Sequence, residues 1–172
     1  LGPGALNFST GAAYAHLSAM PMIIITGQKG ILSSRQAKFQ IVDVISSMKP
    51  ITKMARQIVS ASSIPTIVRD AFRVATEERP GPVLLELPED IAAEEAEAHL
   101  VPSHPIDIPV AHPTAIARAA AVILMAERPL IMLGAAASRP RATGELGGFV
   151  MRPAIPFGAC RVGAGAVWWG PS

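Results

Sequence analysis

One short stretch constrains this chain more than any other: residues 79–88 read Arg-Pro-Gly-Pro-Val-Leu-Leu-Glu-Leu-Pro. A Pro-Gly-Pro turn leads directly into a short apolar run, and another proline ends that run. Because proline has no amide hydrogen, neither Pro82 nor Pro88 can continue a central hydrogen-bonded ladder. The pattern therefore predicts a short buried strand over residues 83–87, with a turn on each side.

The residues before this strand predict a helix and an earlier strand. In residues 64–77 the apolar positions recur at spacings of three and four, with Ser62 or Ser63 as N-cap, which is typical of a helix with one buried face. Residues 22–26 form a continuous apolar run, as in a strand buried on both faces. Alternating helices and strands predict an α/β fold with a mainly parallel sheet.

A change in composition predicts a division of the chain. Residues 91–113 combine acidic residues with prolines and three histidines, without any apolar periodicity, and we interpret them as a linker. The α/β rhythm restarts with Thr114 as a helix N-cap, followed by a strand at 130–133, a helix at 143–150 and a strand at 155–157. We expect one domain over residues 1–90, the linker over 91–113, and a second domain over 114–172.

Several classes of function are disfavoured by composition. The net charge of +2 is small and the basic residues are scattered, which argues against nucleic-acid binding. The apolar runs are shorter than the roughly 20 residues that span a bilayer. The single Cys160 cannot form an internal disulfide and fits a cytoplasmic protein. The linker histidines match no zinc-ligand spacing, so we predict no metal site there.

Three further motifs, together with residues 79–88, carry a resemblance to a known family. They are Gly-Pro-Gly-Ala-Leu-Asn at 2–7, Ile-Ile-Ile-Thr-Gly-Gln at 23–28, and Phe-Gln at 39–40. In order and spacing over residues 1–140, the chain resembles the thiamine-diphosphate enzymes of the acetolactate synthase type. That family also includes pyruvate oxidase, benzoylformate decarboxylase and glyoxylate carboligase. The resemblance implies that residues 1–90 are the latter part of the family's parallel-sheet pyrimidine-binding domain and that residues 114–172 are the beginning of its central α/β domain.

The resemblance implies roles for five residues. Asn7, Gln40 and Arg79 correspond to cofactor-binding positions, Arg79 to one that contacts FAD in flavin-containing members. Phe39 and Lys53 correspond to positions at the substrate channel. Two simpler interpretations stay open: Gln40 as a helix-start residue that bonds its own backbone, and Arg79 as a cation at the carboxyl end of the helix over residues 64–77.

Other parts of the family pattern are missing from these 172 residues. The family's catalytic glutamate precedes the Gly-Pro-Gly-Ala motif, and no Gly-Asp-Gly occurs to hold the diphosphate through Mg²⁺. After about residue 160 the sequence departs from the family. We therefore expect a piece of a large subunit with no catalytic residue or metal site of its own, and no activity by itself.

The expected parent enzyme is a homo-oligomer that joins 2-oxo acids such as pyruvate with loss of CO₂, and builds each active site from two chains. Two alternatives stay open. One is another thiamine-diphosphate lyase, such as a 2-oxo acid decarboxylase or oxidase. The other is a non-catalytic α/β assembly module that kept the fold and lost the site.

Overall fold

The computed structural model describes residues 1–32, 39–97, 99–103, 110–138, 140–151 and 155–160. The chain divides into two compact units, Leu1–Ile106 and Asp107–Ser172. Each contains helices and parallel strands, which confirms the predicted α/β class. The atypical segment expected after residue 160 lies outside the described residues.

Unit 1 is built on a parallel three-stranded sheet in the order β1-β3-β2. Its strands are β1 (Met22–Gln28), β2 (Met54–Gln57) and β3 (Pro82–Pro88). β3 therefore includes both prolines, one residue beyond the predicted strand at each end. Strand β2 was not predicted, because its sequence, Met-Ala-Arg-Gln, contains no sustained apolar run.

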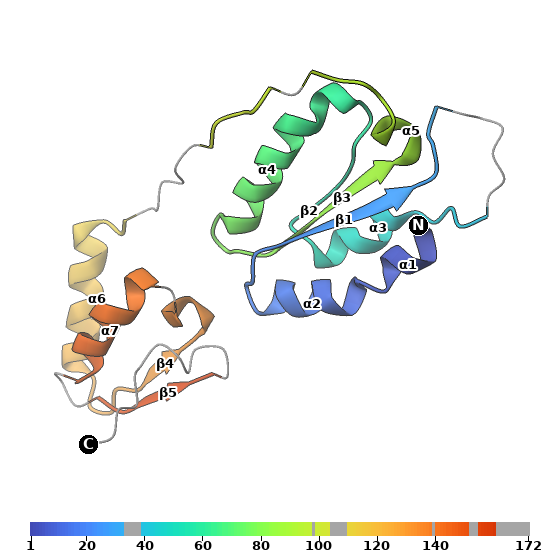
Figure 1. Cartoon of the computed structure of the whole chain (residues 1–172). Coiled ribbons are helices and arrows are strands. Elements are labelled where there is room, and N and C mark those ends of the chain that lie inside the picture. Colours follow the sequence, from blue (N-terminus) through green and yellow to red (C-terminus); the bar gives the residue numbers. More distant parts are fainter. Residues whose placement is uncertain (33–38, 98, 104–109, 139, 152–154, 161–172) are drawn as a thin grey trace. The chain divides into compact units, whose positions relative to one another are not determined.

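Helix α4 (Ile64–Thr76) covers one face of this sheet, as Figure 1 shows. Its buried residues Ile67, Ala71 and Ala75 recur at the predicted helical spacing and pack in one cluster with Val83 and Leu85 of β3. The sequence prediction of this helix is confirmed. Packing of its amphipathic face, rather than helix propensity, supplies most of the stability of such a helix.

The opposite face carries α1 (Gly2–Leu6), α2 (Ser9–Leu17) and α3 (Val44–Met48) (Figure 1). The second core cluster lies here. Its buried members are Ala5, Ala12, Ile24, Val44, Met48 and Leu84. Because strand side chains alternate between faces, the residues two positions beyond Ile24 and Leu84 point to this same side.

Two short 3-10 helices, Lys49–Ile51 and Ala61–Ser63, flank β2 in the chain. After β3, the chain turns into α5 (Glu89–Ala92), whose Ile91 is buried against the α4-side core. Residue 91 was expected to start the linker. It belongs instead to the core of unit 1, because one helical turn after β3 returns its apolar side chain to the sheet.

Unit 2 contains α6 (Pro113–Met125), β4 (Ile131–Leu133), a 3-10 helix (Ala135–Ser138), α7 (Pro140–Met151) and β5 (Phe157–Ala159). Strands β4 and β5 pair in parallel. The N-cap of α6 is His112, not Thr114, because proline takes the first helical position and moves the cap one residue earlier. Within the described residues, no helix is long and apolar enough to cross a membrane.

Candidate functional site

Three polar side chains meet at the carboxyl edge of the parallel sheet. Gln28 and Gln57 are the last residues of β1 and β2, and Glu86 lies two residues before the end of β3. Strand alternation places all three on the face that carries α1 to α3. In open α/β sheets, ligand sites lie outside the carboxyl ends of the strands.

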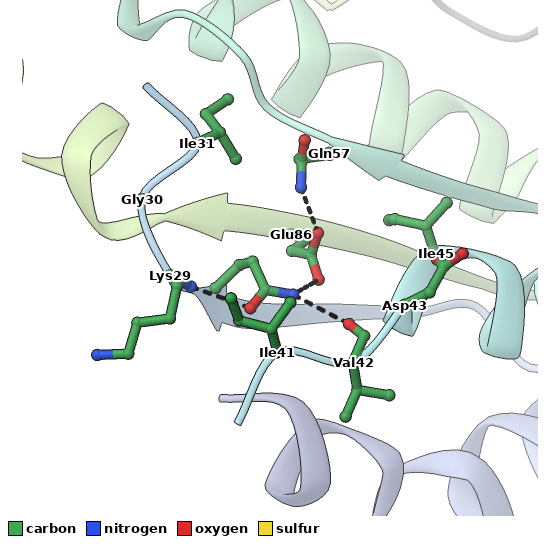
Figure 2. A pocket seen from close by; sticks show the side chains of 10 residues that line it. Lys29, Gly30, Ile31, Ile41, Val42, Asp43, Ile45, Gln57 and Glu86 are labelled. Atoms are coloured by element: carbon green, nitrogen blue, oxygen red, sulfur yellow. Dashed lines mark hydrogen bonds between the residues drawn. The ribbon is translucent and has the colours of Figure 1, made fainter. Parts of the chain in front are cut away.

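Hydrogen bonds join these residues into one network, drawn in Figure 2. Gln57 donates from Nε2 to Glu86 Oε2 at 2.7 Å, and Gln28 donates from Nε2 to Glu86 Oε1 at 3.1 Å. Gln28 Nε2 also donates to the Val42 carbonyl at 3.1 Å, and Gln28 Oε1 accepts from the Lys29 amide at 3.0 Å. Glu86 is 2 % exposed. The carboxylate thus replaces its lost hydration with two amide donors.

A cavity of about 540 Å³ opens beside the network, and Gln28, Gln57 and Glu86 line it together with Ile31, Ile41 and Ile45. Figure 2 shows these isoleucine side chains around the polar cluster. Apolar walls with a few fixed polar groups are typical of small-molecule sites. We refer to this space below as the carboxyl-edge cavity.

Two aspartates lie around this end of the sheet. Asp43, which lines the cavity, caps α3 by accepting from the Ser46 amide at 2.9 Å, and this bond lowers the pKa of its carboxyl group. Asp90 accepts from the Leu32 amide at 2.7 Å, which lowers its pKa in the same way. Both are therefore anionic at neutral pH. Of the two, only Asp43 lines the cavity, and Lys29 lines it as well, so the lining offers both a carboxylate acceptor and an ammonium donor.

Within the described residues, no group of three or more His, Cys, Asp or Glu side chains gathers closely enough to hold a metal ion. The expectation of no metal site stays a prediction.

Comparison with known proteins identifies the relatives of this chain. No protein-family model matches it. It is 38 % identical over 153 residues to a probable acetolactate synthase large subunit of Methanocaldococcus jannaschii, covering 84 % of this chain and 26 % of that protein. It is 35 % identical over 176 residues to the corresponding protein of Methanococcus aeolicus, covering 96 % and 29 %. The chain belongs to the acetolactate synthase family.

A third relative is the glyoxylate carboligase of Escherichia coli O157:H7, 30 % identical over 168 residues, with 96 % of this chain and 28 % of that protein covered. The chain therefore spans less than a third of the length of these relatives. Its similarity to acetolactate synthases extends along most of its own length.

Of the residues that the acetolactate synthase resemblance singles out, Gln40 and Phe39 lie nearest in sequence to the cavity. Both are exposed, and Gln40 adopts a positive φ of 63°. The next residue, Ile41, lines the cavity. Asn7 is exposed at the carboxyl end of α1. No ligand contact tests these three roles, which stay predictions.

Lys53 and Arg79 lie before the amino ends of β2 and β3, opposite the carboxyl-edge cavity. The Lys53 ammonium donates to the carbonyls of Val74 and, at 2.7 Å, Glu77, at the end of α4. Burial is the main cause that lowers its pKa. One chain therefore does not bring Lys53 together with Gln40, and its role at a substrate channel stays a prediction.

The interpretation of Arg79 as the cation at the end of α4 is wrong. Lys53 occupies that position, and the Arg79 guanidinium donates to the carbonyl of Leu17, the last residue of α2. The chain leaves α4 in an extended conformation at Glu77, with ψ of 147°, which carries Arg79 away from the α4 carbonyls. Contact of Arg79 with FAD stays a prediction.

Sequence reasoning missed the central residues of the site, Gln28, Gln57 and Glu86. One signal was present: Glu86 is a charged residue inside an otherwise apolar strand. A buried carboxylate requires hydrogen-bond donors, and such residues often mark functional sites. The identity of its donors could not be read from the sequence.

Proposed function

We propose that this chain is part of a thiamine-diphosphate-dependent enzyme of the acetolactate synthase type, and that the carboxyl-edge cavity contributes to its cofactor site. The reaction joins two 2-oxo acids, such as pyruvate, with loss of CO₂. One observation carries the proposal. This chain, which is similar to acetolactate synthases, has a buried amide–carboxylate network at the carboxyl edge of its parallel sheet, and the network includes the carbonyl of Val42, two residues after Gln40.

The cavity residues fit the aminopyrimidine end of thiamine diphosphate. Ile31, Ile41 and Ile45 offer apolar surface for a planar ring. Because Gln57 Nε2 donates to Glu86, the carbonyl oxygen of Gln57 remains as an acceptor for an amino group, and Asp43 offers a carboxylate. When bound, the cofactor supplies carbanion stabilisation that amino-acid side chains lack.

Among the described residues, no group of three or more His, Cys, Asp or Glu side chains is available to hold the Mg²⁺ of the diphosphate. Mg²⁺ prefers several oxygen ligands in near-octahedral geometry. The proposal therefore assigns Mg²⁺ and diphosphate binding to residues other than those described. A homo-oligomeric state, a cytoplasmic location and an FAD contact at Arg79 are further parts of the proposal that rest on the resemblance.

A second candidate is a related lyase with another 2-oxo acid substrate. The 30 % identity to a glyoxylate carboligase over 96 % of this chain supports it. The product of the whole reading frame that encodes these residues separates the two candidates: acetolactate formation from pyruvate supports the first, and preference for another 2-oxo acid supports the second.

Calorimetric titration of the 172-residue chain with thiamine tests the cavity. We expect weak binding, and a decrease in affinity of about tenfold in Gln57→Leu, the equivalent of one strong hydrogen bond. Lys49→Met, a change at an exposed residue outside the cavity lining, is the matched control. Equal thiamine affinity in the native chain and Gln57→Leu would contradict the assignment.

A further inference from the structure

We infer that Glu86 is a positioning residue: acting through Gln28, it holds the backbone of residues 40–42, which we name the Gln40 turn, in a defined place beside the carboxyl-edge cavity. The role of Gln40 toward a cofactor rests on the proposed function. The positioning is a property of this chain alone and can be tested without any cofactor.

The Glu86 carboxylate can only accept hydrogen bonds when it is ionised. A glutamine amide beside it must therefore turn its NH₂ group toward Glu86. Gln28 does so at 3.1 Å. Its carbonyl oxygen then faces the Lys29 amide at 3.0 Å, and its second N–H is directed to the Val42 carbonyl at 3.1 Å. The Glu86 carboxylate on β3 thus favours the same Gln28 amide orientation as the Lys29 amide and the Val42 carbonyl do, and this orientation binds the turn.

The surroundings leave this network little freedom. Glu86 is 2 % exposed and Gln28 is 7 % exposed, so water does not compete freely for their bonds. Within the described residues, no ion pair to Glu86 is present that could replace the amide donors. Gln57 holds the second carboxylate oxygen at 2.7 Å. The carboxylate is therefore fixed from β2 while it orients Gln28.

The Gln40 turn is also confined by α1. A β-carbon at Gly2, in α1, would lie 2.3 Å from the Gln40 carbonyl oxygen and 2.9 Å from Val42 Cγ2. Gln40 itself has a φ of 63°, a conformation that costs an L residue free energy and persists only where its surroundings impose it. Contact with α1 and the Gln28 bond together supply that constraint.

Nuclear magnetic resonance of the 172-residue chain tests the inference. In the native chain, we expect a through-hydrogen-bond coupling between Gln28 Nε2 and the Val42 carbonyl carbon. In Glu86→Gln, an uncharged side chain of the same shape no longer requires the Gln28 NH₂ group to face position 86, and the backbone resonances of residues 40–42 should shift. Thr26→Val, on the same face of β1, is the control and should leave them in place.

A double variant separates positioning from core repair. Combining Glu86→Gln with Gln28→Glu restores an amide–carboxylate pair with the partners exchanged, but the carboxylate at position 28 cannot donate to Val42. We expect stability to recover relative to Glu86→Gln while the Gln40 turn stays displaced. Recovery of the native resonances in the double variant would overturn the inference, as would an absent Gln28–Val42 coupling in the native chain.

Thiamine titration distinguishes the two proposals. If Glu86→Gln displaces the turn and lowers thiamine affinity about tenfold, comparable to the loss of one hydrogen bond, both stand. If the turn moves but the native chain does not bind thiamine, the cofactor assignment fails and the positioning role stands. If the turn does not move, the positioning role fails whatever thiamine does. The native-chain coupling decides the matter if Glu86→Gln does not fold.

Discussion

The Lys53 ammonium donates to the carbonyl of Glu77 at 2.7 Å, across a separation of 24 residues. It also donates to the Val74 carbonyl, so a cation from the residue before β2 caps the carboxyl end of α4. Carbonyl groups in the last turn of a helix have no partner within the helix, and the helix dipole favours a cation there. This contact ties α4 to the amino edge of the sheet.

Lys53→Met should lower the free energy of unfolding by about 1–2 kcal/mol, because two carbonyls lose a charged donor. Urea unfolding monitored by circular dichroism measures the change. The control is Lys49→Met, at an exposed position, where we expect less than about 0.5 kcal/mol. Equal effects of the two variants would show that the contact with the end of α4 contributes nothing.

The same lysine predicts a dependence of stability on pH. Burial outweighs the attraction of Glu77 and lowers the folded-state pKa of Lys53 below the usual lysine value of 10.5. Between the folded and unfolded pKa values the unfolded chain binds more protons, so this group's contribution to stability rises as pH increases toward 10.5. Unfolding of the native chain and Lys53→Met across this window should show a shallower rise in the variant.

A pair of glycines in α1 tests how closely this helix approaches the Gln40 turn. Gly2→Ala should cost about 1–3 kcal/mol, because the new β-carbon would lie 2.3 Å from the Gln40 carbonyl oxygen. Nothing lies within 4 Å of the corresponding position at Gly4, so Gly4→Ala should be neutral or gain up to about 1 kcal/mol through helix propensity. Thermal unfolding of both variants checks the contrast, and a stabilised Gly2→Ala chain would refute it.

Two buried threonines predict opposite effects of the same substitution. Within the described structure, the Thr26 hydroxyl has no hydrogen-bond partner, whereas Thr52 donates to the Met48 carbonyl at 2.9 Å. Thr26→Val should stabilise the chain by about 1 kcal/mol, because it removes an unpaired buried hydroxyl. Thr52→Val should destabilise it by a similar amount. Matching signs in chemical denaturation would contradict the hydrogen-bond assignments.

The 172-residue chain should not convert pyruvate to acetolactate, even with thiamine diphosphate, Mg²⁺ and FAD present. General acid–base assistance alone contributes about 10²–10⁴-fold, and loss of orientation costs more. The sequence contains neither the family's activating glutamate in its motif context nor a Gly-Asp-Gly. Acetolactate assays on this chain and on the product of the whole reading frame measure the difference. Comparable rates would contradict the prediction, because they would show that these 172 residues contain all the groups that catalysis requires.

Local pattern determined much of unit 1. The spacing of apolar residues in α4 indicates its buried face, and the apolar run between two prolines indicates the short buried strand β3. Both elements could therefore be predicted from the sequence. The motifs at residues 2–7 and 39–40 likewise carried the family resemblance that the relatives confirm. Short elements were less visible: α3 and β2 have too few residues for periodicity to show, and packing on the sheet stabilises them.

Only the tertiary structure decided which polar groups meet. Gln28 and Glu86 are 58 residues apart, and Gln57 and Glu86 are 29 apart, yet parallel pairing brings all three to one edge. For the same reason, Lys53 and not Arg79 binds the carbonyls at the end of α4, a role that one of the open interpretations gave to Arg79. Periodicity in a sequence encodes the face that a side chain occupies. The hydrogen-bond partner of that side chain on a neighbouring strand depends on strand order and register, which cannot be read from a single sequence.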